Sequence, residues 1–145
     1  MTSKYFKIQE LVSKNVYNKY GDKSWEFINP KIIKFLDRLR EDLNQPITVN
    51  NWLWGGEFQQ RGLRGNKDPM VVDKKDYYLS QHCLGNAVDF NVKNMTTKEV
   101  YDYIINNYNK YMDCITRIEN IESAKTWVHV DCANTQSQSL VVFRG

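Results

Sequence analysis

The sequence predicts an α+β domain in which one central antiparallel sheet is flanked by helices. Apolar residues at helical spacing occupy the first third of the chain and a stretch after residue 96, and short alternating segments follow each of them. The 145 residues contain no repeat, linker or low-complexity tract. A chain of this length can bury a core without disulfides, so residues 1–145 are expected to form a single domain.

Two helical regions are expected before the first strand. Residues 4–20 show a loose helical period that ends at Gly21. A clearer helix begins at Asn29 and Pro30, because Asn is a favoured N-cap and Pro is favoured at the first helical position. Its apolar residues recur at three- and four-residue spacing until Pro46 ends it.

The rest of the chain alternates between strands, one helix and one long irregular segment. Residues 96–99 form a capping box that begins a helix running to about residue 112. Residues 52–78 are rich in Gly, Arg, Asn and Asp and lack periodicity, which is typical of a functional loop. Five strands are expected, at residues 47–51, 87–92, 115–121, 126–132 and 140–143.

The composition is that of an ordinary globular protein, with 41% hydrophobic and 26% charged residues. The net charge of +3 is too mild to indicate a nucleic-acid partner. The first eight residues have no uninterrupted apolar run, so we expect synthesis in the cytoplasm without a signal peptide. No stretch is long enough to predict membrane insertion.

Three cysteines, an odd number without a C-x-x-C pair, argue against a zinc ribbon or a thioredoxin-type centre. Cys83 and Cys132 adjoin candidate metal ligands, so either could supply a thiolate. The simpler interpretation is a small, half-buried side chain on a strand.

The two histidines carry the strongest functional signal. His82 lies in S-Q-H-C-L-G-N-A-V-D, which ends at Asp89, and His129 lies in W-V-H-V-D. Strand alternation places Asp89 and His129 on the polar faces of their strands. If these strands share a sheet, the two side chains converge. His82, Asp89 and His129 would then bind Zn²⁺ and leave a fourth coordination position open, the arrangement of a catalytic zinc site.

Together, S-x-H-x-x-G-x-A-x-D and W-x-H-x-D resemble the zinc D-alanyl-D-alanine carboxypeptidase family. Its relatives include vancomycin-resistance dipeptidases, bacteriophage endolysins that cut L-Ala–D-Glu in peptidoglycan, and the hedgehog signalling domain. The resemblance covers residues 80–92 and 126–132 and extends in part to 47–64. It implies zinc ligation by the two histidines and Asp89, and a peptidoglycan stem peptide as substrate. We expect the enzyme to be a monomer.

The family also places an arginine upstream, often in S-G-Y-R, to bind the substrate or the charge of the transition state. The segment R-G-L-R ends at Arg64, which is the better match, and begins at Arg61, which is the alternative because the serine is absent. A guanidinium can hold a carboxylate or carbonyl oxygen with two donors.

The general base has three candidates. Many relatives carry an acid three residues before the last histidine, where this chain has Thr126. Glu122 matches the hedgehog-like Glu-Ser arrangement with one extra residue and is the first choice. Glu119 is an alternative, and so is Asp131, which could instead orient an imidazole.

The predicted function is zinc-dependent hydrolysis of peptidoglycan, of the D-Ala-D-Ala carboxypeptidase or L-Ala-D-Glu endopeptidase type. We expect a phage-type endolysin that acts on the cell wall after release through a holin; a virion component that opens the wall at entry would use the same chemistry. The alternative is a non-catalytic, zinc-stabilised module that binds a wall peptide or a protein partner, which Thr126 favours. The ligands alone do not determine which bond is cut.

Overall fold

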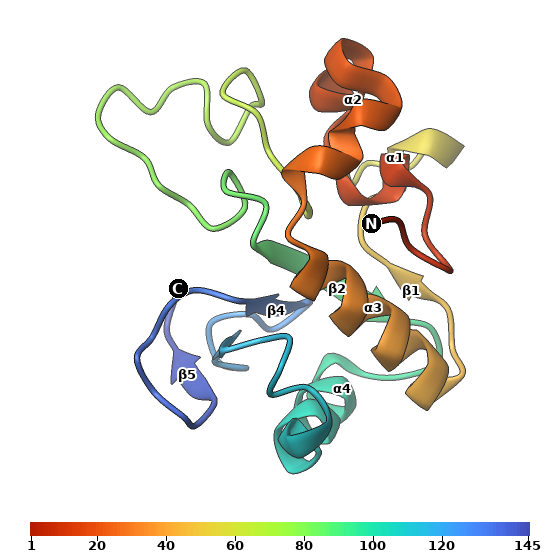
Figure 1. Cartoon of the computed structure of the whole chain (residues 1–145), viewed down its shortest axis with the longest axis vertical. Helices are drawn as coiled ribbons and strands as arrows, with labels where there is room; N and C mark the ends of the chain where they lie inside the picture. Colours follow the sequence, from red (N-terminus) through yellow and green to blue (C-terminus); the bar gives the residue numbers. More distant parts are fainter.

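The first third of the chain is helical in the computed structural model, which describes residues 1–145 (Figure 1). The helices are α1 (Ile8–Leu11) and α2 (Lys14–Tyr20), a 3₁₀ segment (Gly21–Phe27), and α3 (Pro30–Leu43). As predicted, the Asn29 side chain caps α3 by accepting a hydrogen bond from the Lys31 main-chain N–H, and Pro30 occupies the first helical turn.

The expected capping box is also present, where Thr96 and Glu99 satisfy each other's main-chain N–H groups. The helix that it begins, α4 (Thr97–Asn106), is shorter than predicted and continues as a 3₁₀ turn at Tyr108–Lys110. No helix of the protein has both the length and the apolar character needed to cross a membrane.

Five strands form one sheet in the order β1-β2-β4-β3-β5. All five lie within the predicted segments, and most are shorter than predicted. They are β1 (Ile47–Thr48), β2 (Ala87–Val92), β3 (Arg117–Glu119), β4 (Val128–Asp131) and β5 (Val141–Phe143).

The sheet is mixed, which corrects the expectation of a purely antiparallel one. Strand β4 pairs antiparallel with both β2 and β3, whereas β5 pairs parallel with β3. The reason is positional. The chain reverses after β4, but both edges of β4 are already paired, so β5 adds to the outer edge of β3 and therefore runs parallel to it.

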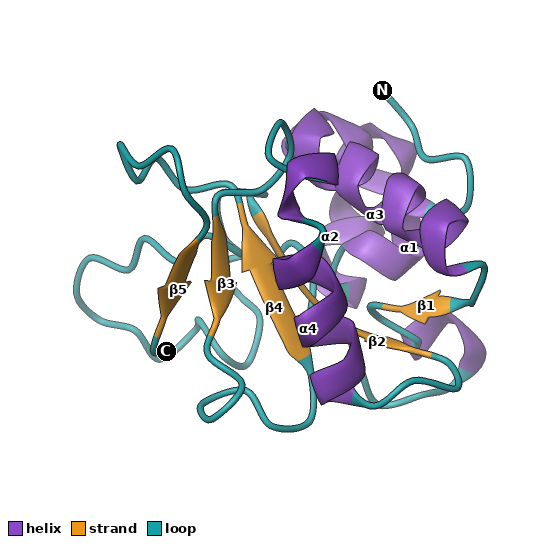
Figure 2. Ribbon diagram, turned by 90° about the horizontal axis from the view of Figure 1, so that it is seen from below, coloured by secondary structure: helices purple, strands orange, loops and turns teal.

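The two faces of the central strands differ sharply in polarity. Val88 and Phe90 on β2, with Val128 and Val130 on β4, join one buried apolar core with α3 and α4. Phe90 packs edge-to-face against Phe35 of α3, with ring centroids 5.9 Å apart. Figure 2 shows α4 packed across the strands. The alternate residues of β2 and β4 face the other way, which leaves that face for polar side chains.

The segment between β1 and β2 contains only one short 3₁₀ turn, Trp52–Trp54, and its middle projects from the body of the molecule as a long loop (Figure 1). Its first part is tied to the N-terminal helices, because Leu63 exchanges main-chain hydrogen bonds with Leu11 and Ser13. The prediction of an irregular segment is confirmed.

Candidate metal centre

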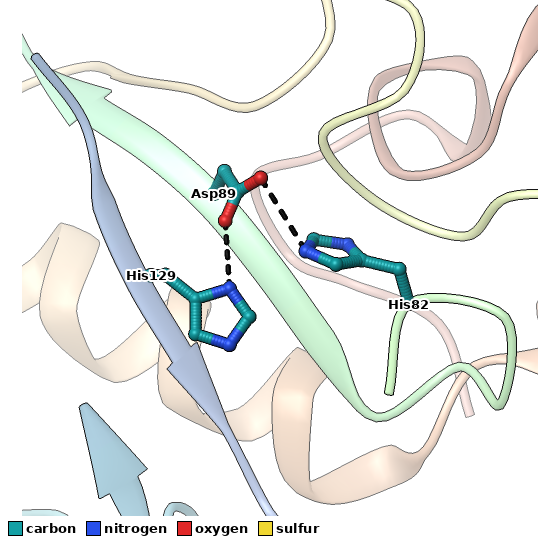
Figure 3. Close-up of side chains that lie close together, drawn as sticks. All are labelled: His82, Asp89 and His129. Atoms are coloured by element: carbon teal, nitrogen blue, oxygen red, sulfur yellow. Dashed lines mark hydrogen bonds and ion pairs between the residues drawn. The ribbon is translucent and has the colours of Figure 1, made fainter. Parts of the chain in front are cut away.

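Strand register brings Asp89 and His129 together. They are direct partners in the β2–β4 ladder, so their side chains leave the same face at the same level. The Asp89 Oδ1 atom lies 2.8 Å from His129 Nδ1. His82, from the turn before β2, places its Nε2 atom 3.3 Å from Asp89 Oδ2 (Figure 3). All three side chains are buried, and their ligand atoms lie within 4.8 Å of one another, so the group could hold a metal ion.

The outward-facing nitrogen of each imidazole has its own partner. His82 Nδ1 lies 2.9 Å from the Gly62 main-chain oxygen, and His129 Nε2 lies 2.9 Å from Asp131 Oδ2. Both partner oxygens accept, so these ring nitrogens donate. The remaining nitrogens, His82 Nε2 and His129 Nδ1, both face Asp89. Carbonyl or carboxylate partners behind a ligating imidazole are a usual feature of metal sites, because they fix its tautomer and orientation.

Electrostatics in the metal-free protein favour a proton between His129 and the carboxylates. Burial works to lower the pKa of His129, but hydrogen bonds to Asp131 and Asp89 outweigh it and raise the pKa to about 9. Burial works to raise the pKa of Asp89, but the two histidines outweigh it and hold that pKa well below its usual range. A metal ion would replace this proton, because a ligating imidazole must be neutral at the bonded nitrogen.

The turn that carries His82 is built as the motif suggests. The His82 main-chain N–H donates to Ser80 Oγ at 3.2 Å, which gives the serine its orienting role. Gly85 has φ of +73°, and a Cβ atom there would clash with the Phe27 main-chain oxygen. The tight reversal before β2 therefore requires glycine both for its backbone conformation and for its lack of a side chain.

A cavity of about 680 Å³ lies over the three residues. Its walls come from the irregular segment, through Tyr78 and Leu79, from Glu119 on β3, and from Trp127, which immediately precedes β4. Burial raises the pKa of Glu119; the nearby Asp89 also raises this pKa, whereas the two histidines lower it. Of the three general-base candidates, Glu119 and Asp131 line this cavity.

Glu122, the first choice from sequence, is not brought to the site. It lies in the turn after β3, its side chain is exposed, and it is absent from the cavity wall. Thr126 is exposed as well. The sequence spacing misleads here because the β3–β4 connection carries Glu122 past the end of the sheet, whereas Glu119 is still on β3.

Both candidate arginines lie next to Asp89 and differ in what they contact. Arg64 is buried; its Nε donates to the Gln60 main-chain oxygen at 2.6 Å and its Nη2 lies 3.6 Å from Asp89 Oδ2. Arg61 donates from Nη2 to Asn91 at 2.6 Å and lies over the Phe58 ring, and its buried Nη1 has no hydrogen-bond partner. Arg64 therefore has one hydrogen bond to the protein and lines the cavity over the three residues, whereas Arg61 does not line that cavity and its unpartnered Nη1 is buried.

Two residues of the site gave no signal in the motifs. Arg117 on β3 forms a bidentate ion pair with Asp131, and Phe143 on β5 lies beside both Arg117 and His129. Alternation places Arg117 on the same strand face as Glu119, which is the only sequence feature that could have identified it. The cysteines are not part of the ligand group; Cys132 donates to the Asn86 main-chain oxygen, and burial raises the pKa of both Cys83 and Cys132.

Searches against models of known protein families, against curated proteins and against solved structures gave no match to this chain. Fold and site alone define the class of this protein: a single-domain α+β protein with a mixed five-stranded sheet and a buried His-Asp-His group that could hold a metal ion.

Proposed function

We propose that this protein is a zinc-dependent peptidase that hydrolyses the stem peptides of bacterial peptidoglycan. One observation carries the proposal. His82 Nε2, His129 Nδ1 and the Asp89 carboxylate converge at the floor of a cavity, and the other nitrogen of each imidazole is held by a fixed acceptor.

The donor set fits zinc. Two neutral imidazoles and one carboxylate are a usual three-residue zinc set, and they leave a further coordination position for water or substrate. They would leave a net charge of +1 at the ion, and a bound zinc ion would supply Lewis-acid activation of a water molecule and of a carbonyl oxygen. No cysteine belongs to the group, which argues against a closed structural site.

Glu119 is the proposed general base. Peptide hydrolysis needs a carboxylate that takes a proton from the attacking water and passes it to the leaving amine. Glu119 lines the same cavity as the three ligands, and burial raises its pKa toward the working range of such a group. Glu122 does not line this cavity.

The arginines divide two tasks. Arg64 holds the ligand Asp89 from the side and keeps its carboxylate oriented. Arg61 lines a smaller cavity of about 270 Å³, which shares Arg64, Asp89 and Trp127 with the larger one. Its guanidinium, which lies over the Phe58 ring beside this smaller cavity, is a candidate for holding a carboxylate or carbonyl oxygen of the substrate.

Peptidoglycan as substrate rests on the resemblance of the two histidine motifs to the zinc carboxypeptidase and endolysin family. The irregular segment supports a peptide substrate, because it supplies aromatic and apolar side chains to the cavity wall above the ligands.

The test compares two isosteric variants of equal charge change. Glu119→Gln is expected to slow release of peptides from purified peptidoglycan by about a hundredfold or more, the scale of general-base loss, with zinc content unchanged. Glu122→Gln is the matched control and is expected to retain wild-type rates. Mass spectrometry of the digest identifies the bond that is cut. Full activity in Glu119→Gln with loss in Glu122→Gln would reverse the assignment.

A non-catalytic, zinc-stabilised binding module is the second candidate, favoured by Thr126 at the position where many relatives carry an acid. It predicts stoichiometric zinc and binding of stem peptide without release of any fragment. Turnover of purified peptidoglycan by the zinc-loaded wild-type protein excludes it.

A further inference from the structure

A polar cluster lies directly behind His129, on the side away from Asp89. At its centre, the Asp131 side chain is completely buried. Its Oδ1 accepts from Arg117 Nε at 2.8 Å and from the Ala133 main-chain N–H at 3.1 Å. Its Oδ2 accepts from Arg117 Nη2 at 2.7 Å and from His129 Nε2 at 2.9 Å. Each oxygen of this carboxylate therefore accepts two hydrogen bonds.

Three of these four bonds hold the carboxylate, and one is made to the candidate ligand. The Arg117 fork engages both oxygens of Asp131, which fixes the plane of the carboxylate as well as its position. With Asp131 held in this way, its Oδ2 is a fixed acceptor. His129 must then present Nε2–H to Asp131, and Nδ1 is left for the metal.

We infer that Arg117 is a positioning residue for the metal centre, which acts through Asp131 to hold His129 in the tautomer and orientation that ligation requires. The inference rests on the metal site of the proposed function and extends it to a residue that touches none of the proposed ligands directly.

Charge supports this arrangement. A lone carboxylate behind His129 would add a negative charge next to the metal centre. The Arg117 guanidinium offsets that charge, so Asp131 contributes orientation without changing the net charge of the ligand set. A buried carboxylate without such a partner would be strongly disfavoured.

Phe143 completes the cluster from the edge strand β5. The Arg117 guanidinium carbon lies 4.1 Å from the centroid of its ring, and the His129 ring meets it edge-on with centroids 5.5 Å apart. The same aromatic ring therefore limits the movement of both the arginine and the ligand. This explains why β5, which is only three residues long, bears on the site.

The other ligand histidine is held differently. His82 Nδ1 donates to a main-chain oxygen, that of Gly62, and no ionised side chain stands behind it. Loss of Arg117 should therefore disturb His129 and leave His82 in place.

The experiment measures the affinity of the full chain for Co²⁺, used as a spectroscopic probe, by competition with a chelator. Arg117→Gln is expected to lower the affinity by about 10- to 100-fold, the usual effect of losing a partner behind a ligand. Arg117→Lys keeps the charge but cannot make two parallel hydrogen bonds, so its Co²⁺ affinity is expected to lie between those of wild type and Arg117→Gln. Arg38→Gln is the matched control, because Arg38 also forms a two-bonded pair with an aspartate, Asp113, away from the site; it is expected to bind Co²⁺ within about twofold of wild type.

A double-variant cycle separates positioning from general destabilisation. Because Arg117 acts through Asp131, the double variant Arg117→Gln/Asp131→Asn should lose little more affinity than Asp131→Asn alone. In the Zn²⁺-loaded wild-type protein, imidazole ¹⁵N shifts should show that His129 carries its proton on Nε2. In Arg117→Gln the ¹⁵N shifts of His129 should change, whereas those of His82 should not.

The outcomes are distinct. Wild-type affinity in Arg117→Gln, losses that add in the double variant, or an equal loss in Arg38→Gln would overturn the inference while the metal site stands. Absence of Co²⁺ binding by the wild-type protein would overturn the metal site and the inference together. Peptide hydrolysis is not among the readouts, so its absence bears on the proposed function alone.

Discussion

The candidate metal centre has a strand-borne half and a loop-borne half that are held by different means. Asp89 and His129 are register partners on adjacent central strands, fixed by the ladder and by the core beneath them. His82 and Arg64 come from the irregular segment between β1 and β2, where a few main-chain hydrogen bonds and the tight turn at Gly85 hold the chain.

The difference shows that two parts of one site can be held by different kinds of contact. The strand-borne half is assembled whenever the sheet forms, because its geometry follows from pairing. The loop-borne half depends on contacts that a single backbone change can break, and it also contributes to the cavity wall through which a substrate would be selected.

The largest expected effect comes from deleting the imidazole of the strand-borne half. His129→Ala should abolish metal binding and lower the free energy of unfolding of the metal-free protein by about 3–5 kcal/mol, because two buried carboxylates lose their shared partner. His82→Ala should also abolish metal binding but lower that free energy by only about 1–2 kcal/mol, since it loses the bond to Gly62 and the longer contact with Asp89, which keeps its bond to His129. Denaturant unfolding in the presence of a chelator measures both. Equal losses would contradict the distinction between the two halves.

A pH dependence follows for the strand-borne half. The pKa of His129 is raised to about 9 from 6.5, so its contribution to the stability of the metal-free protein is complete below about pH 6.5 and is lost as the pH rises through 9. The loss is at most about 3–4 kcal/mol, because the pKa rises from 6.5 to about 9 and each pKa unit corresponds to about 1.4 kcal/mol. Metal affinity should show the opposite trend and increase over the same interval, because the metal displaces the proton.

Unfolding curves at several pH values in chelator, with metal titrations alongside, test this. His129→Ala is the control and should remove most of the pH slope. A metal-free protein whose stability is constant between pH 6.5 and 9 would contradict the proposed protonation of His129.

A smaller effect is expected from breaking the loop-borne half through its backbone. Gly85→Ala should lower the free energy of unfolding by roughly 2 kcal/mol and weaken metal binding, because the added Cβ meets the Phe27 main-chain oxygen and the positive φ is strained. Gly55→Ala is the matched control, since Gly55 has φ of +84° but open space around the added Cβ. It isolates the backbone strain and should leave metal affinity unchanged. Equal loss of metal affinity in both variants would show that Gly85 does not position His82.

Much of the local structure was predictable because it depends on short-range chemistry. The Asn29 cap, the Thr96–Glu99 capping box and the extent of β2 all follow from neighbouring residues, and the structure confirms them. Strand alternation likewise predicted that Asp89 and His129 would each lie on the polar face of its own strand, and the β2–β4 pairing is what makes those two faces one.

Tertiary structure alone decided what depends on strand order and on distance through space. The parallel pairing of β5 follows from the occupied edges of β4 and leaves no trace in the sequence of β5 itself. The sequence also did not show which glutamate lies at the cavity. Glu119 is on β3 and lines the cavity, whereas Glu122, three residues later, is in an exposed turn. Arg117 contacts Asp131 only because the register of β3 and β4 makes them direct partners, so no motif in either strand could predict this ion pair. Local patterns specify which faces are polar, and the packing of the sheet specifies which polar groups meet.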